Sequence, residues 1–270
     1  MLRAGQRFLR NIHRSVSSDD SVDVSESNGV RSLHLGNSTV QSSMRLIDPN
    51  ALELAYTRGM MMFLLFAPHV RDVVMIGLGG GSIAKYIHQY VPLIDKVKVL
   101  EINPRVIQIA RSHFEVPDND ERLDIIGGDG AQYVKEHPNT VQALMIDAFD
   151  SNGIPPDLCS QEFFDYCAQA LTPDGLLTIN LWGSDRNFDV YLQRIERAFD
   201  RRVLILPTGR PGNIVVLAFR RMPTELRWAE LRERARKLEQ THRIEFLQFL
   251  EKIRECNPGT AHRLTLEGSL

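Results

Sequence analysis

The chain has 270 residues, of which 43% are hydrophobic and 24% charged, so it is long enough to bury a globular core. Its formal net charge of -2 lacks the basic excess that binding to nucleic acid or to an anionic membrane surface exploits, so we expect neither partner. Three scattered cysteines are too few for a disulfide framework, and no apolar run reaches the ~18 residues of a membrane span. These features predict a cytoplasmic protein.

The amino-terminal segment differs in composition from the rest of the chain. Arginines between Arg3 and Arg14 precede any acidic residue, and serines and acids then crowd residues 15–27. This pattern favours a disordered leader over residues 1–30, although an Arg-rich and Ser-rich start is also typical of an organellar transit peptide.

Residues 31–67 predict a small module in front of the main domain. Short extended segments with turn residues at Gly36 and Asp48 favour a β-hairpin over residues 32–47. Apolar residues near helical spacing then predict a helix over residues 51–66, which ends before Pro68.

Strands and helices alternate over residues 68–222, which predicts a parallel sheet covered by helices on both faces. Because only a short Pro/Gly-rich segment joins the last two strands, we expect that pair to be antiparallel. Residues 224–255, in a carboxyl-terminal region of residues 223–270, predict one long charged helix that Thr224 could cap. The expected strands cover residues 72–76, 96–102, 123–126, 143–146, 175–181, 202–206 and 214–219, and the helices between them residues 82–90, 104–113, 131–136, 161–171 and 188–199.

A glycine-rich turn, GLGGGS over residues 77–82, joins the first expected strand of this domain to its helix. Glycines let a backbone approach a ligand closely, so Gly77, Gly79 and Gly81 are candidate nucleoside contacts, although a merely tight turn has the same pattern. Ser82 replaces the third glycine of the dinucleotide motif and could instead cap the helix. Glu101, which closes the next strand, could accept hydrogen bonds from both ribose hydroxyls. Together these residues predict a nucleoside site.

The ends of the third and fourth strands indicate which nucleoside would bind. Asp129, followed by Gly130, is placed to accept a hydrogen bond from an adenine amino group. Asp147 and Asp150 form a carboxylate pair that suits a cation better than a pyrophosphate, although such a loop could simply cap backbone groups. The pattern therefore favours an adenosyl sulfonium over NAD.

Five motifs in order resemble those of the polyamine aminopropyltransferases, the spermidine synthase family. They read GLGGGS (77–82), LEIN (100–103), GDG (128–130), DAFDSNG (147–153) and LPTGRPG (206–212). The resemblance covers residues 33 to about 219 and implies a class I S-adenosylmethionine-dependent methyltransferase-like (Rossmann-like) α/β fold, with an amino-terminal β-hairpin module and a carboxyl-terminal helix. It implies transfer of an aminopropyl group from decarboxylated S-adenosylmethionine, a co-substrate rather than a resident cofactor, to putrescine or a related amine.

The same resemblance implies a role for each candidate residue. Asp147 would be the catalytic base and Asp150 would bind the far ammonium of the diamine. Glu101 would bind the ribose and Asp129 the adenine. Tyr56 would contact the substrate amine, although a core tyrosine is an equal alternative. The other implied substrate contacts are Gln41, which resembles the family's hairpin glutamine, and Asn180, which stands where the family has a substrate-contacting glutamine.

Three positions depart from the family pattern. Gly80 replaces the aspartate of the glycine turn, Gly209 replaces a tyrosine and Ser151 replaces a proline. Two other hypotheses therefore remain: a methyltransferase that uses the same pocket, and a nucleoside-binding protein without catalysis. We expect no metal, because the histidines show no ligand spacing and the leaving thioether is neutral, and we expect a homodimer.

Overall fold

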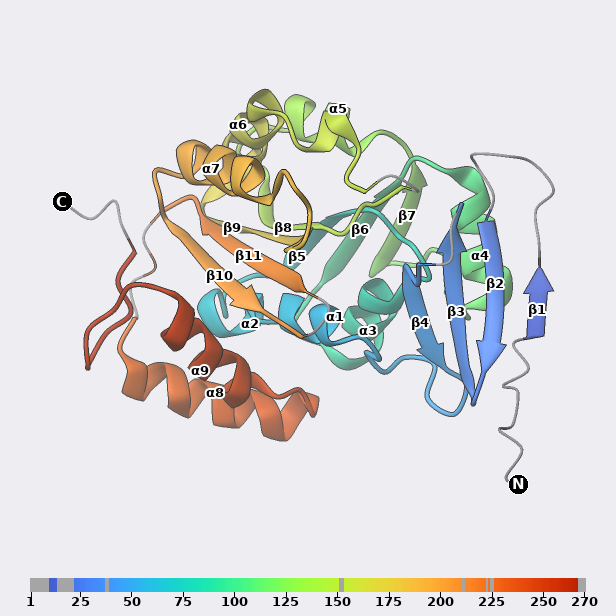
Figure 1. Cartoon of the computed structure of the whole chain (residues 1–270), viewed down its shortest axis with the longest axis horizontal. Coiled ribbons are helices and arrows are strands. Elements are labelled where there is room, and N and C mark those ends of the chain that lie inside the picture. Colours follow the sequence, from blue (N-terminus) through green and yellow to red (C-terminus); the bar gives the residue numbers. More distant parts are fainter. Residues whose placement is uncertain are drawn as a thin grey trace, which may run out of the picture.

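The computed structural model describes residues 10–13, 22–36, 39–150, 153–209, 212–221, 223 and 226–266. It contains a large central sheet, with a small sheet at one end of the molecule and a helical pair at the other (Figure 1). The strands are β1 (Arg10–His13), β2 (Val22–Ser27), β3 (Val30–Leu35), β4 (Ser42–Arg45), β5 (Asp72–Ile76), β6 (Lys96–Glu101), β7 (Leu123–Gly127), β8 (Val141–Ile146), β9 (Leu171–Trp182), β10 (Val203–Pro207) and β11 (Asn213–Phe219). The helices are α1 (Ala55–Met60), α2 (Phe63–Phe66), α3 (Ser82–Tyr90), α4 (Pro104–His113), α5 (Gly130–Glu136), the 3-10 turn η1 (Pro156–Leu158), α6 (Gln161–Ala170), α7 (Phe188–Ala198), α8 (Trp228–His242) and α9 (Phe246–Cys256).

The large sheet has the strand order β10-β11-β9-β8-β5-β6-β7. Strands β5 to β9 pair in parallel, whereas β11 pairs antiparallel with both β9 and β10. This topology confirms the predicted parallel sheet and the predicted antiparallel terminal pair. It also places the carboxyl ends of β5, β6, β7 and β8 side by side, where ligands of open α/β sheets bind.

Helices cover both faces of the large sheet because its strands are apolar on both sides. Val73 and Met75 of β5 belong to a core formed with α1 to α4, α8 and α9, whereas Val74 and Ile76 belong to a core formed with α5, α6 and α7. This alternation follows from the period of two in a strand. None of the helices in the described parts of the chain is long and apolar enough to span a membrane.

Short polar side chains cap the first turns of two helices that pack on the large sheet. Asn103 caps α4 by accepting a hydrogen bond from the backbone N–H of Arg105, and Ser160 caps α6 by accepting one from Phe163. Such caps satisfy backbone donors that the first turn leaves without partners. Ser82 was expected as a possible cap of the helix after the glycine turn, but it does not cap α3. It is the first helical residue, and its hydroxyl donates to the carbonyl oxygen of Ser43.

The small sheet, in the order β1-β2-β3-β4, is attached to the large one through a buried lysine. The Lys85 ammonium on α3 donates to the carbonyl oxygens of Pro49 (2.7 Å) and Phe114 (2.5 Å). Its side chain thereby links the loop that follows β4 to the loop that follows α4. These hydrogen bonds attach the amino-terminal module to α3 and α4 of the main domain.

The expectation of a disordered leader over residues 1–30 is wrong for Arg10–His13 and Val22–Ser27, which form β1 and β2. Strand β2 pairs with β3 along its length, and Val22 and Val24 are buried against α4 and the rest of the core. The strand was not predicted from the sequence because polar residues alternate with these valines. The remaining leader, residues 1–9 and 14–21, lies outside the described residues.

Two predicted helices are each divided in the structure. The helix expected over residues 51–66 is present as α1 and α2, separated by a turn at Met61 and Met62. The carboxyl-terminal helix expected over residues 224–255 is present as α8 and α9, because Arg243 adopts a left-handed conformation with φ of 55° and reverses the chain. The two helices then pack against each other and α9 packs against β10. Thr224 lies outside the described residues.

Candidate active site

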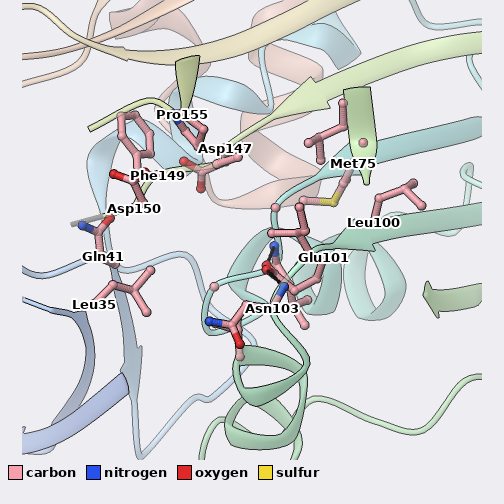
Figure 2. Close-up of a pocket in the computed structure, with 18 of the residues that line it drawn as sticks. Leu35, Gln41, Met75, Leu100, Glu101, Asn103, Asp147, Phe149, Asp150 and Pro155 are labelled. Atoms are coloured by element: carbon pink, nitrogen blue, oxygen red, sulfur yellow. Dashed lines mark hydrogen bonds between the residues drawn. The ribbon is translucent and has the colours of Figure 1, made fainter. Parts of the chain in front are cut away.

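A cavity of about 730 Å³ lies at the carboxyl edge of β5, β6, β7 and β8. Other parts of its wall come from the small sheet with the loop before β4, from α1 and from the segment after β8, through Gln41, Tyr56 and Asp150 among others. Figure 2 shows two groups of polar side chains in it: Asp147, Asp150 and Gln41 gather at one end, and Glu101 and Asn103 at the other. A ligand that fills the cavity would contact both groups.

The cavity is strongly acidic. Among the described residues that line it, Arg105 is the only cationic side chain. Confined carboxylates with so little compensating positive charge repel an anion such as pyrophosphate and attract a cation. No group of three or more His, Cys, Asp or Glu in the described ranges is arranged to hold a metal ion. The acidic lining residues are Glu101, Asp129, Asp147, Asp150 and Asp157.

Asp147 follows β8 directly and accepts hydrogen bonds on both carboxylate oxygens. The Tyr56 hydroxyl donates to Oδ2 at 3.1 Å, and the Asn180 amide donates to Oδ1 at 3.0 Å. Burial raises the pKa of Asp147 to about 6, although the hydrogen bonds from Asn180 and Tyr56 oppose this rise. A carboxylate with this pKa is ionised at neutral pH and is a stronger base than an exposed aspartate.

Tyr56 lies on α1, and its ring is almost fully buried. Burial and the neighbouring charge of Asp147 raise the pKa of Tyr56 well above its usual range, so its hydroxyl stays protonated and donates. The same hydroxyl lies 3.2 Å from the backbone oxygen of Gln41. Tyr56 thus connects Asp147 to the loop that precedes β4.

Glu101 ends β6 at the opposite end of the cavity from Asp147, and only 8% of its surface is exposed. Its two carboxylate oxygens accept backbone N–H groups of Leu78 and Asn103, each at 2.9 Å. Burial raises the pKa of Glu101, and these backbone hydrogen bonds oppose that rise. As a hydrogen-bond acceptor in the cavity wall, the carboxylate could also accept hydrogen bonds from a ligand diol.

Asp129 lines the cavity and caps α5, because its Oδ1 accepts the backbone N–H of Ala131 at 2.8 Å. The cap fixes the side chain and leaves Oδ2 without a hydrogen bond to any described residue. Gly130 follows in the cavity wall, where an added Cβ would lie 2.4 Å from Ile76. The GDG motif therefore places one oriented carboxylate at a tightly packed strand end.

The glycine turn contributes two of its three predicted contacts to the cavity. Gly77 and Gly79 line it, and Gly77 has a φ of 93° and a backbone so close to β8 that an added Cβ would lie 2.3 Å from the carbonyl oxygen of Asp147. Gly81 is not among the lining residues, contrary to the expectation that it contacts the nucleoside. A Cβ there would lie 2.3 Å from Val116, so Gly81 serves the packing of α3.

Asn180 lies behind Asp147 on β9 and is not among the residues that line the cavity. This placement differs from the expectation of a substrate contact. Its amide oxygen accepts a hydrogen bond from Asn213 at 3.0 Å. Sequence reasoning missed Asn213, because it belongs to none of the quoted motifs and meets Asn180 only through the pairing of β9 and β11.

Gly80, which replaces the family's aspartate, does not face the cavity. A Cβ at this position would lie 2.8 Å from Oγ of Ser42 and 2.9 Å from the Phe114 ring. Ser42 of the small sheet and Phe114 after α4 therefore occupy the space that a side chain would need.

We predict that Gly80→Asp lowers the melting temperature, with a loss of about 1 to 3 kcal/mol as for other overpacked sites, and does not tighten nucleoside binding. Thermal scanning and titration with methylthioadenosine measure the two quantities. Gly209→Ala is the matched control, because the nearest atom to its Cβ is Cβ of Ala55 at 3.9 Å. A Gly80→Asp variant that is as stable as the parent chain would contradict this packing argument.

Known proteins resemble this chain in amino-acid sequence and in fold. The spermine/spermidine synthase domain model matches residues 53–199. The polyamine aminopropyltransferase of Chromobacterium violaceum is 39% identical over 260 residues, which are 96% of this chain and 99% of that protein. A crystal structure of spermidine synthase in complex with the transition state analogue AdoDATO has a TM-score of 0.71 at 21% identity, over 89% of this chain and 85% of that one. Human methyltransferase-like protein 13 in complex with SAH has a TM-score of 0.63 at 22% identity, over 70% and 93% respectively.

The two structural matches confirm the predicted methyltransferase-like, Rossmann-like fold. The family model spans more than half of the chain, and the bacterial relative aligns with almost all of it. The resemblance that the five motifs carried is therefore confirmed, and the chain belongs to the spermine/spermidine synthase family.

Proposed function

We propose that the protein is a polyamine aminopropyltransferase, which moves the aminopropyl group of decarboxylated S-adenosylmethionine to putrescine or a related amine. The observation that carries the proposal is the half-buried carboxylate of Asp147, held by two hydrogen-bond donors at the wall of an acidic cavity. Its environment suits a base that must take a proton from an alkylammonium near neutral pH.

In this reaction the nitrogen of the amine attacks the methylene carbon next to the sulfonium. The new C–N bond forms as the C–S bond breaks, and the electron pair of that bond goes to sulfur, so neutral methylthioadenosine leaves without a proton. The acceptor, however, is an ammonium with a pKa of roughly 10 in water and must first lose a proton. Asp147 accepts that proton. Fixing nitrogen and carbon in contact supplies much of the remaining acceleration.

The remaining side chains bind the two substrates. Glu101 accepts hydrogen bonds from the ribose hydroxyls, Asp129 accepts one from the adenine amino group, and the backbone of Gly77 and Gly79 lies against the nucleoside. Asp150, which lines the cavity on the loop after β8, binds the far ammonium of the diamine. The substrate amine is contacted by Tyr56 and Gln41.

A panel of donors and amines tests the proposal. Decarboxylated and ordinary S-adenosylmethionine are each incubated with putrescine, cadaverine and spermidine, and products are read by mass. We expect methylthioadenosine together with an amine heavier by one aminopropyl group, from the decarboxylated donor alone. Formation of S-adenosylhomocysteine from the ordinary donor would indicate a methyltransferase instead. Binding of methylthioadenosine without any product would indicate a nucleoside-binding protein.

A further inference from the structure

We propose that Asn213 is a positioning residue, which fixes the direction in which the Asn180 amide faces the carboxylate of Asp147. Asn213 touches neither the cavity nor Asp147 itself, and it acts only through Asn180. The kinetic consequence rests on the proposed role of Asp147 as the base, whereas the geometric claim does not.

The pairing of β9 with β11 brings the two asparagines together. Asn180 pairs with Val215, and Asn213 pairs with Trp182, so Asn213 is the diagonal neighbour of Asn180 on the same face of the sheet. Leu176 and Val215, which share that face, belong to the core formed with α1, whereas Ile179 and Leu181 belong to the opposite core. Both amides therefore lie on the side of the sheet where Tyr56 and Asp147 meet.

The amide of Asn180 has two orientations that differ by a half turn, and only one of them serves Asp147. In that orientation its NH₂ group donates to Oδ1 of Asp147, while its oxygen accepts from the NH₂ group of Asn213. The reversed orientation would bring two NH₂ groups together and aim the Asn180 oxygen at a carboxylate. Since Asn180 is only 3% exposed, water cannot compensate for either contact. The donor on Asn213 and the acceptor on Asp147 thus favour the same orientation of the Asn180 amide.

Asn213 is itself held in place by its backbone. Its carbonyl oxygen accepts both the N–H and the hydroxyl of Thr208, each at 3.0 Å. The methyl group of Thr208 packs against Gly59 on α1, where an added Cβ would lie 2.6 Å from it. Tyr56 and Asn180 are the two donors to Asp147. The β10-β11 hairpin therefore supports both donors, Tyr56 through α1 and Asn180 through Asn213.

Reversing the polarity of Asn213 tests the proposal most directly. Asn213→Asp keeps the shape of the side chain, but the ionised carboxylate can only accept, so it competes with Asp147 for the NH₂ group of Asn180. That competition favours protonated Asp147, and the added charge acts in the same direction. We expect the acidic limb of kcat/KM against pH to move up by about one unit, with about a fivefold loss near pH 6 and recovery above pH 8. The side chains that share the cavity with Asp147 and titrate or carry charge are Tyr56, Glu101, Arg105, Asp129, Asp150 and Asp157.

The uncharged variant Asn213→Leu separates the hydrogen bond from the charge. We expect a smaller shift in the same direction, and in an Asn180→Ala background we expect Asn213→Leu to shift nothing further. Equal shifts in both backgrounds would overturn the proposal, because Asn213 would then act independently of Asn180. Ile214→Val, on the opposite face of β11, is the control and should leave the profile unchanged.

A second measurement does not depend on turnover. Carbon-13 NMR of aspartate-labelled protein follows the Asp147 carboxyl, which is assigned by its loss in Asp147→Asn, and its midpoint should rise in Asn213→Asp. An unchanged midpoint in a folded variant overturns the inference even if the enzyme is active. Absence of turnover with every donor and amine, together with a shifted midpoint, instead overturns the proposed function and leaves the inference standing.

Discussion

Asp147→Asn is expected to lower kcat by about a thousandfold with putrescine, which is the middle of the range for removing a general base. The asparagine keeps the volume of the side chain and one acceptor for the Tyr56 or Asn180 donor, but it cannot take a proton from the ammonium. Binding of methylthioadenosine should change little, because Glu101 at the other end of the cavity holds the ribose in the proposed complex. Steady-state kinetics and titration calorimetry measure the two quantities.

The pH dependence of the parent enzyme follows from the same carboxylate. Asp147 is active as a base only when ionised, and burial raises its pKa to about 6. We therefore expect kcat/KM to be constant at higher pH and to fall about tenfold per unit below that pKa. Asp147→Asn should lose this limb together with the activity.

The melting temperature of Asp147→Asn distinguishes loss of the catalytic base from loss of the folded state. The folded pKa of Asp147, about 6, exceeds its ordinary value of 3.8, so the folded state binds more protons than the unfolded state between these values. Its ionisation consequently reduces stability as pH rises through this window. Asp147→Asn removes that cost, and we expect its melting temperature at pH 7.5 to equal or exceed that of the parent chain.

Asp174→Asn is the matched control, because Asp174 is an exposed residue in the amino-terminal half of β9, away from the cavity. It should retain parental kcat and melting temperature. Turnover by folded Asp147→Asn within tenfold of the parent value would show that another group accepts the proton.

Local patterns predicted the large sheet well, because its strands are short apolar runs bounded by turn residues. Strand β5 was expected at residues 72–76 and is found at Asp72–Ile76, and α4 begins at the proline that its pattern predicted. The same patterns failed where long-range packing decides the structure. Nothing local marks the left-handed Arg243 that divides α8 from α9, and β2 depends on pairing with β3 rather than on its own polar sequence.

The candidate site divides in the same way. Acids at strand ends were predictable, since parallel strands place their carboxyl ends at one edge, and Glu101, Asp129, Asp147 and Asp150 all line the cavity. The support around these acids was not predictable. Asn180 contacts Asp147 rather than the cavity, and it meets Asn213 only through the antiparallel pairing of β9 with β11.

Glu101→Gln is expected to weaken methylthioadenosine binding about a hundredfold. In the proposed complex the carboxylate accepts both ribose hydroxyls, and hydrogen bonds to a charged group each contribute about 1.5 to 3 kcal/mol. The neutral amide retains one oxygen, which must also serve the backbone N–H groups of Leu78 and Asn103. The NH₂ group of the glutamine would then face one of these backbone N–H groups. The substitution therefore also removes a hydrogen bond that holds the backbone around the glycine turn.

Titration calorimetry of methylthioadenosine and thermal scanning of the free protein distinguish the two roles of Glu101. A residue that only supported the turn would lower the melting temperature while the folded protein kept its affinity. Glu121→Gln, at an exposed position just before β7 and hence at the opposite edge of the sheet, should change neither quantity. Because the acidic cavity attracts any cation, the decisive ligand is methylthioadenosine, which carries no charge. An affinity of Glu101→Gln for it within threefold of the parent value would place the ribose elsewhere in the cavity.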